Sequence, residues 1–163
     1  MIHSHKTSYS REAYDTCLRG KTIASLINLI KSSNLEFDAI AMMGMSQLVV
    51  GSIIANALGK GIYIIRKKGE SSHAYHTEEG AIADKYIIID DFIGEGKTLA
   101  EEISRLPDGA KCVGLFFYTD HYATAKVVQL GRIPSDTEAY TNAEYYEQLK
   151  DIPAFGIDYS KTA

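Results

Sequence analysis

Four short apolar segments constrain the fold of this chain more than any other feature of its sequence. They cover residues 37–43, 62–65, 86–89 and 113–118, and helical patterns separate most of them. Apolar residues run through each segment almost without interruption, as they do in strands that are buried on both faces of a parallel sheet. Helices must then cover both faces of that sheet. The sequence therefore predicts an α/β fold.

Three helical patterns precede or separate the predicted strands. One begins near Ser10 and runs to about residue 30, a second covers residues 48–58, and a third covers residues 97–106. The polar stretch 67–80 has no periodicity and predicts a long loop, so the order is α-β-α-β-loop-β-α-β. A length of 163 residues without internal repeats predicts a single domain over 1–163.

Composition argues against several classes of partner. The net charge is −4, whereas broad nucleic-acid binding requires a basic surface. The apolar runs are far too short to span a bilayer, and the N-terminus lacks an apolar signal region, so we expect no membrane association. Cys17 and Cys112 have no CxxC spacing, and no ligand cluster accompanies the histidine pairs. We therefore expect free thiols, no zinc site and a cytoplasmic protein.

Three loops should meet at one edge of the sheet, because ligands of parallel sheets bind at the carboxyl ends of the strands. They are residues 44–47, 66–76 and 90–98. The third begins with two adjacent acids, Asp90 and Asp91, and continues into a glycine-rich turn and a helix. Glycines that let backbone N–H groups approach an anion, a hydroxyl and a helix N-terminus together make a phosphate cradle. This segment therefore predicts an anion site beside two carboxylates.

Two other interpretations of the segment 90–98 are open. Gly96-Lys97-Thr98 suggests a nucleotide P-loop, and with it an ATP-dependent hydrolase or kinase, but that motif requires glycine where Asp91 stands. An ordinary strand–turn–helix junction would explain the glycines. It would not explain two adjacent carboxylates at the end of a buried strand, where unpaired charges are costly.

The same segment resembles the signature of the type I phosphoribosyltransferases that binds 5-phosphoribosyl 1-pyrophosphate (PRPP). There, an apolar strand, two acidic residues and a loop of the form Thr/Ser-Gly-x-Thr follow one another. The resemblance implies that Asp90 and Asp91 are the catalytic pair that serves the ribose hydroxyls. It implies that the 5-phosphate is held by the loop formed by Gly94, Glu95, Gly96, Lys97 and Thr98.

The resemblance also has consequences for the architecture. It implies a mostly parallel five-stranded sheet flanked by helices. The core would cover about residues 36–118. A small hood outside it would be formed by residues 1–35, by residues 119–163 or by both.

The other two loops fit the same family by their order. The resemblance implies that pyrophosphate is bound by Gly44, Met45, Ser46 and Gln47 and by the cations Arg66, Lys67 and Lys68. Three cations together in an acidic chain favour a local anion site, although a solvated charge run is the alternative. Residues 70–80 would close over the site and exclude water. For residues 44–47, an ordinary β–α turn stays an open alternative.

Two residues depart from the family pattern. Gln47 stands where a glycine is usual, and Glu95 stands where threonine or serine is usual. A carboxylate about 4 Å from a phosphate would cost roughly 4 kcal/mol at an effective dielectric constant of about 20. We therefore expect that Glu95 points away, that Lys97 offsets it, or that phosphate binding is weakened.

The tail after residue 118 carries aromatic residues that could contact a base, pack on the core or lie at a subunit interface. They are Tyr140, Tyr145, Tyr146, Phe155 and Tyr159, and Asp120-His121-Tyr122 follows the fourth predicted strand. The segment 153–159 resembles the hood of the 6-oxopurine members of the family. That resemblance implies a purine as the substrate and Asp158 as a ligand of a second magnesium ion.

The resemblance implies an enzyme that transfers the phosphoribosyl group of PRPP to a nucleobase and releases pyrophosphate. Mg²⁺ carried by PRPP would be the cofactor, and a homodimer is the usual assembly of the family. A non-catalytic regulator of the same fold that senses PRPP or a nucleotide is the alternative, which Glu95 and Gln47 favour. Release of pyrophosphate that depends on a base would distinguish the two.

Overall fold

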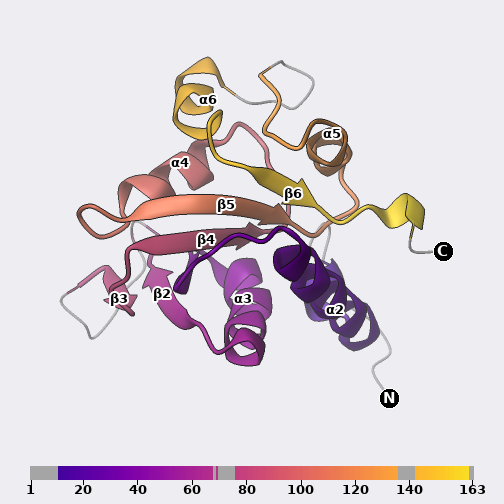
Figure 1. The fold of residues 1–163 in the computed structure, drawn as a ribbon, viewed down its shortest axis with the longest axis horizontal. Coiled ribbons are helices and arrows are strands. Elements are labelled where there is room, and N and C mark those ends of the chain that lie inside the picture. The colour runs from indigo at the N-terminus through magenta and orange to yellow at the C-terminus, as the bar shows by residue number, and fades with distance from the viewer. Residues whose placement is uncertain (1–10, 68, 70–75, 136–141, 162–163) are drawn as a thin grey trace.

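A six-stranded sheet forms the middle layer of the molecule, and helices cover both of its faces (Figure 1). The structure is a computed structural model that describes residues 11–67, 69, 76–135 and 142–161. In chain order the elements are α1 (Arg11–Tyr14), α2 (Thr16–Ser32), β1 (Ala39–Met42), α3 (Met45–Leu58), β2 (Gly61–Ile65), β3 (Glu78–Gly80), β4 (Lys85–Asp90), α4 (Lys97–Ser104), β5 (Lys111–Phe117), α5 (Tyr122–Leu130), α6 (Ala143–Leu149), β6 (Ala154–Gly156) and the 3-10 turn η2 (Tyr159–Lys161).

The sheet is parallel except at one edge. Its strand order is β3-β2-β1-β4-β5-β6, and among these strands only β3 runs antiparallel to its neighbour, β2. β1 pairs with β2 on one side and with β4 on the other. The connections that leave β1 and β4, the two central strands, therefore run toward opposite edges of the sheet. Such a switch point opens a crevice beyond the carboxyl ends of the strands. The loops that follow β1 and β4 therefore lie next to each other.

The two faces of the central strands contribute to two separate cores. On one face Ile40 and Ile87 belong to the core that α2 and α3 cover. On the other face Tyr86 and Ile88 belong to the core that α4, α5 and α6 cover. All four side chains are 0% exposed, which explains why the strands are apolar at every position rather than at alternate ones.

The predicted α/β fold with a mostly parallel sheet is confirmed, and the sheet has six strands rather than five. The four predicted strands correspond to β1, β2, β4 and β5. The two others are β3, which lies within the predicted loop 67–80, and β6, which lies in the tail. Each is three residues long, which is too short for a periodic sequence signal.

The predicted helices are present with shifted boundaries. The first is divided at Asp15, whose carboxylate accepts hydrogen bonds from the backbone N–H groups of Cys17 and Leu18 at 2.9 and 3.0 Å and caps α2. Ser10 lies outside the described residues. The second helix begins at Met45 instead of residue 48, directly after Gly44. This early start places the N-terminus of α3 at the crevice.

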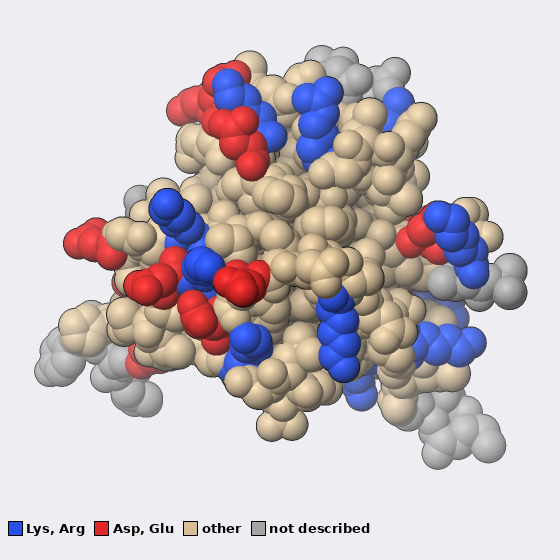
Figure 2. All heavy atoms as spheres, viewed as in Figure 1, with Lys and Arg blue, Asp and Glu red and all other residues tan. Residues whose placement is uncertain are grey.

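Three observations bear on the expectations from composition. No helix within the described part of the chain has the length and apolar character needed to cross a membrane. Cys17 and Cys112 are both free thiols. On the face shown in Figure 2, acidic and basic side chains lie interspersed.

Candidate functional site

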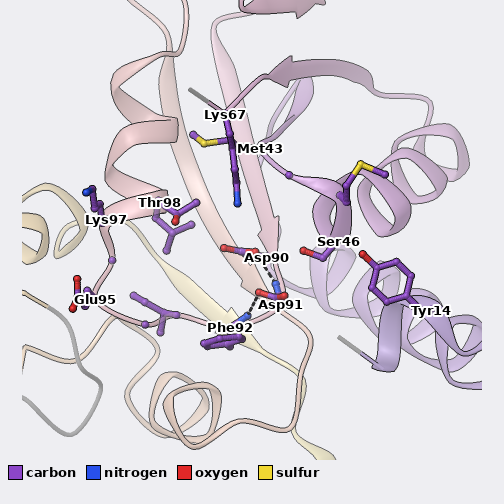
Figure 3. Close-up of a pocket in the computed structure, with 16 residues that line it drawn as sticks. Tyr14, Met43, Ser46, Lys67, Asp90, Asp91, Phe92, Glu95, Lys97 and Thr98 are labelled. Atoms are coloured by element: carbon purple, nitrogen blue, oxygen red, sulfur yellow. Dashed lines mark hydrogen bonds between the residues drawn. The ribbon is translucent and has the colours of Figure 1, made fainter. Parts of the chain in front are cut away.

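Two adjacent carboxylates, Asp90 and Asp91, stand at the carboxyl end of β4 (Figure 3). The backbone N–H of the next residue in the chain holds each carboxylate by a hydrogen bond. The N–H of Asp91 donates to Oδ1 of Asp90, and the N–H of Phe92 donates to Oδ1 of Asp91, both at 2.9 Å. Each aspartate is only 8% exposed. Local hydrogen bonds thus fix two buried carboxylates in a set orientation.

The surroundings of Asp90 disfavour its ionised form. Burial, and after it the charge of Asp91, raise the pKa of Asp90 from 3.8 to about 7, although hydrogen bonds from the Asp91 backbone and the Gln47 side chain oppose this shift. In Figure 3 the side chain of Lys67 extends toward Asp90. Because hydroxyl donors or positive charge would stabilise the ionised pair, the site favours ligands that bring them.

The glycine-rich turn between Asp91 and α4 is suited to an anion. Gly96 has a φ of 86°, a left-handed conformation that favours glycine, and it is the N-cap of α4. Since glycine has no side chain, it cannot accept hydrogen bonds from the first N–H groups of the helix. These N–H groups and the positive end of the helix dipole are therefore available to a ligand.

Glu95 does not obstruct this turn. It is exposed, and in Figure 3 its side chain extends from the outer side of the turn, away from Asp90 and Asp91. Its carbonyl accepts a hydrogen bond from the N–H of Asn142 at 2.9 Å, which attaches the turn to the N-terminus of α6. Of the three arrangements expected for Glu95, the structure has the one in which the carboxylate points away.

The loop between β1 and α3 faces the acid pair from the neighbouring strand. Gly44 has a φ of 114°, a backbone conformation that favours glycine, and a Cβ at this position would lie 3.2 Å from Cε of Lys67. Gln47, in the first turn of α3, is 1% exposed. Its Oε1 accepts a hydrogen bond from the N–H of Met43 at 2.5 Å. The loop is thus held from within by the glutamine.

These elements enclose a cavity of about 620 Å³ at the switch point of the sheet. The lining residues are Tyr14, Met43, Gly44, Met45, Ser46, Lys67, Asp90, Asp91, Phe92, Ile93, Gly94, Glu95, Gly96, Lys97, Thr98 and Leu99. The structure therefore brings together the acid pair, the whole glycine-rich turn, three of the four residues of loop 44–47 and Lys67. Gln47 is the fourth residue of that loop, and it is buried rather than at the cavity surface.

Of the other two predicted cations, the structure describes Arg66 and places it outside the lining of this cavity. Nη2 of Arg66 lies 2.6 Å from Oε2 of Glu79 in β3, and Arg66 is not a lining residue. Lys68 and residues 70–75, which make up most of the expected closing loop, lie outside the described residues. Their roles stay predictions.

A second cavity of about 260 Å³ lies where β5 and β6 end. Its lining residues are Thr119, Asp120, His121, Thr124, Ala125, Val128, Ile157, Asp158, Tyr159 and Ser160. The ring of His121 stacks on Phe92, which lines the first cavity, with 4.6 Å between the ring centroids. The two cavities are therefore neighbours across an aromatic pair.

Asp158 lies in this second cavity and not beside the acid pair. Its carboxylate accepts a hydrogen bond from Oγ of Ser160 at 2.6 Å and pairs with Nζ of Lys161 at 3.0 Å, and these contacts lower its pKa. Within the described ranges, no three His, Cys, Asp or Glu side chains gather in a metal-binding group. A metal bound by Asp158 stays a prediction.

Sequence reasoning missed several residues at the site, and Tyr14 and Glu102 are two of them. Tyr14 of α1 lines the first cavity, and no local pattern marks it, because only the packing of α1 brings it there. Glu102 of α4 is 0% exposed, and its Oε2 accepts a hydrogen bond from Nε2 of Gln47 at 3.2 Å. Glu102 did have a signal, since it follows the buried Leu99 by three residues and so lies on the apolar face of the helix.

Sequence comparisons find relatives of two kinds, and no family model matches the chain. The transcriptional regulator GfcR of Methanocaldococcus jannaschii is 31% identical over 99 residues, which are 55% of this chain and 47% of the regulator. The chain thus spans about half the length of that regulator. The adenine phosphoribosyltransferase of Desulforamulus reducens is 28% identical over 131 residues, 70% of this chain and 75% of the enzyme. That of Caldicellulosiruptor saccharolyticus is 29% identical over 143 residues, with 71% and 81% covered.

Solved structures of the same kind share the fold. The orotate phosphoribosyltransferase of Francisella tularensis superposes with a TM-score of 0.59 at 17% identity, covering 90% of this chain and 69% of that one. The orotate phosphoribosyltransferase of Mycobacterium tuberculosis, solved in complex with PRPP, superposes with a TM-score of 0.53 at 13% identity, with 71% and 67% covered. The chain therefore has the fold of the phosphoribosyltransferases, and its sequence is similar to two adenine phosphoribosyltransferases and to a transcriptional regulator.

Proposed function

We propose that this chain transfers the phosphoribosyl group of PRPP to a nucleobase and releases pyrophosphate. One observation supports this most strongly. The cavity at the switch point combines a buried acid pair with an uncapped helix N-terminus on the adjoining turn. A ribose phosphate needs both, because its hydroxyls donate hydrogen bonds to carboxylates and its phosphate accepts them from backbone N–H groups.

Each part of the cavity has one proposed role. Asp90 and Asp91 would orient the ribose and stabilise the positive charge that develops at its C1 atom. The turn 94–98 would bind the 5-phosphate. The loop 44–47 and Lys67 would face the pyrophosphate and stabilise the charge that it gains on leaving. Little covalent chemistry is required of the protein, because positioning and electrostatics carry such a displacement.

The residues present fit magnesium that arrives with the substrate. Mg²⁺ prefers oxygen ligands and is usually held by one or two carboxylates together with substrate phosphates, and Asp90 and Asp91 are two carboxylates on the cavity wall. When bound, the ion would add positive charge at the pyrophosphate.

We place the base next to Phe92, on the side of the second cavity. Phe92 and His121 offer stacked rings, and Asp120 and Thr119 add polar groups for the edge of a base. A purine is the preferred substrate, supported by the adenine phosphoribosyltransferases among the sequence relatives. The tail after residue 118, which lines this cavity, would then act as the hood.

The second candidate function is a regulator of the same fold that binds PRPP or a nucleotide without turnover. The similarity to the transcriptional regulator favours it, since that relative has the highest identity of the three that we compare. The exposed Glu95 in the phosphate turn also favours it.

A homodimer and a cytoplasmic location belong to both candidates. Light scattering of the purified chain would measure the assembly directly.

Phosphorus NMR tests the proposal. The protein is incubated with PRPP, Mg²⁺ and single bases, and we expect pyrophosphate to form only with an accepted base. Asp91→Asn should abolish its formation, whereas the control Asp108→Asn, in an exposed turn, should not. Broadened PRPP signals without turnover would support the regulator instead. Unchanged PRPP signals with every base would contradict both candidates.

A further inference from the structure

A fully buried glutamate lies beside the candidate site, and the proposed reaction gives it no role. Glu102 is 0% exposed in the second turn of α4. One carboxylate oxygen, Oε2, accepts the hydrogen bond from Gln47, and the other, Oε1, is buried without a hydrogen-bond partner among the described residues. Burial and the nearby charge of Asp90 raise its pKa well above the usual range. The charge of Lys67 acts in the opposite direction.

Gln47 connects this glutamate to the loop between β1 and α3. Its Oε1 accepts from the N–H of Met43, so the amide can have only one orientation, with Nε2 directed toward the carboxylates. Nε2 donates to Glu102, and the same side chain is a hydrogen-bond partner of Asp90. One amide thus joins the end of β1, the acid pair on β4 and the helix α4.

Packing alone does not explain this arrangement. A leucine at position 102 would fill a similar volume among the apolar neighbours of α4 and would bury no polar group. A buried carboxyl group with one of its oxygens unpartnered is costly compared with that alternative. The acceptor that Glu102 offers to Gln47 is the one contact that an apolar side chain could not provide.

We propose that Glu102 is a positioning residue of the PRPP site, which acts through Gln47 to hold the loop 44–47 and Asp90 in their relative places. The inference rests on the proposed function for its effect on PRPP, and on the structure alone for its effect on the loop. It also gives Gln47 a reason to stand where a glycine is usual. A glycine there could neither bind the N–H of Met43 nor reach Glu102.

Three variants test the proposal. Glu102→Leu removes the acceptor and keeps most of the volume, whereas Glu102→Gln keeps an oxygen acceptor for Gln47. Glu101→Leu is the matched control, because Glu101 is the adjacent residue and its side chain is 42% exposed. The readouts are the hydrogen exchange of the Met43 amide by NMR and the KM and kcat for PRPP. Exchange requires no substrate, so it is informative even if the proposed function is wrong.

We expect Glu102→Leu to speed exchange at Met43 at least about tenfold and to raise KM for PRPP by up to about a hundredfold, the loss that a small misplacement can cause. Glu102→Gln should restore both, and the control should change neither. In a background of Gln47→Ala, Glu102→Leu should have no further effect, because its partner is already absent. A general loss of folding would lower the active fraction without changing KM. A raised KM in Glu102→Leu, with no further effect in the double variant, therefore indicates lost positioning.

Specific results would overturn the inference. Unchanged exchange at Met43 in Glu102→Leu would show that Glu102 does not hold the loop. Faster exchange with an unchanged KM would show that the loop does not matter for PRPP. If the wild-type protein neither binds nor converts PRPP, the proposed function and the PRPP part of this inference both fail. The exchange measurement still decides whether the pair holds the loop.

Discussion

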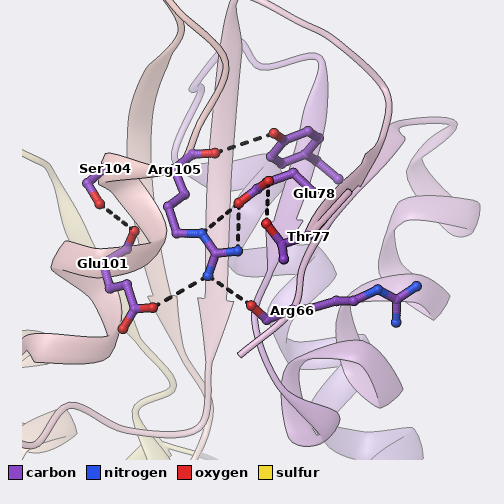
Figure 4. A network of polar contacts seen from close by, with 7 residues as sticks. Arg66, Thr77, Glu78, Glu101, Ser104 and Arg105 are labelled. Carbon is purple, nitrogen blue, oxygen red and sulfur yellow. Dashed lines mark hydrogen bonds and ion pairs between the residues drawn. The ribbon is translucent and has the colours of Figure 1, made fainter. Parts of the chain in front are cut away.

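The two ends of α4 carry polar clusters of opposite character. Asp90 and Asp91 lie before its N-terminus, and Glu102 lies in its second turn; none of these three acidic side chains is more than 8% exposed. At its C-terminal end stands Arg105, which is surrounded by acceptors (Figure 4). The first cluster has an excess of like charges at a cavity. The second pairs opposite charges at the junction of α4 with β2 and β3.

Short hydrogen bonds link Arg105 and Glu78 to the groups around them. Nε of Arg105 donates to Oε1 of Glu78 at 2.7 Å, and Nη1 donates to the carbonyl of Arg66 at 2.8 Å. Oε2 of Glu78 accepts a hydrogen bond from Oγ1 of Thr77 at 2.7 Å, and the backbone N–H of Arg66 donates to the carbonyl of Thr77. Arg105 therefore ties together the two chain segments that flank residues 68–75.

The pKa shifts run in opposite directions in the two clusters. The hydrogen bond from Thr77, followed by that from Arg105, lowers the pKa of Glu78. Burial raises the pKa of Asp90. Ionisation is thus favoured in a cluster that is complete by itself and disfavoured in one that lacks sufficient positive charge. We infer that the Arg105 cluster serves stability and the acid pair serves a ligand, in agreement with the tendency of shifted pKa values to occur at functional sites.

The largest expected effect is on activity at the acid pair. Asp90→Asn keeps an oxygen for the N–H of Asp91 but removes the charge, so we expect kcat to fall by about 10²–10³, as when one stabilising group is lost. The free energy of unfolding at pH 8 should rise in the same variant, because a buried charge next to Asp91 disappears. Pyrophosphate release and urea unfolding measure the two quantities. A variant that loses stability together with activity would contradict the comparison.

Stability should also depend on pH through Asp90. The folded chain keeps the proton of Asp90 up to about pH 7, whereas the unfolded chain releases it near 3.8. The stabilising contribution is therefore complete below the unfolded value and is lost as the pH rises through this window, with a slope of at most about 1.4 kcal/mol per pH unit. Urea unfolding between pH 4 and 8 should show a shallower fall for Asp90→Asn. Parallel curves for the two proteins would exclude this origin.

A smaller effect, on stability, is expected at the other end of the helix. Arg105→Ala leaves Glu78 and the carbonyl of Arg66 without their donor, and we expect the free energy of unfolding to drop by about 2 kcal/mol. The kcat of the folded fraction should change little. Arg132→Ala, at an exposed arginine, is the control for loss of a positive charge. A loss of kcat without a loss of stability would place Arg105 in the site.

The smallest effect is expected at Glu95. Its exposed carboxylate points away from the acid pair, so its repulsion of a phosphate should be close to the value in water, about 1 kcal/mol at 4 Å. Glu95→Thr should therefore lower KM for PRPP by no more than about fivefold. A much larger gain in affinity would mean that Glu95 turns inward and inhibits binding, which would favour the regulator.

Much of this picture could be predicted from short stretches of sequence. The apolar segments indicated buried parallel strands, and the acid pair with its glycine turn indicated a site at the end of the third of them. Both signals lie within contiguous residues. β3 and β6 could not be predicted in this way, because strands of three residues exist only through their pairing with β2 and β5.

The surroundings of the candidate site depend on contacts between residues that are far apart in the sequence. Arg66, which the resemblance places at the pyrophosphate, forms an ion pair with Glu79 on the neighbouring strand. Tyr14 reaches the cavity from α1, and Glu102 meets Gln47 across 55 residues. The helical spacing marks Glu102 as buried, but no local pattern says which residue of another element it meets.

The sequence by itself determined the layered fold, the order of its central elements and the place of the acid pair. The burial pattern of a strand and the conformation of a turn depend on residues that are adjacent in the sequence. A segment with the right residues therefore adopts them wherever it lies in the chain. Only the tertiary structure decided which polar groups are satisfied and which are not. The charge state of Asp90 and the partners of Gln47, Glu102 and Arg105 depend on desolvation and on side chains from other elements. Those quantities exist only once the helices are packed against the sheet.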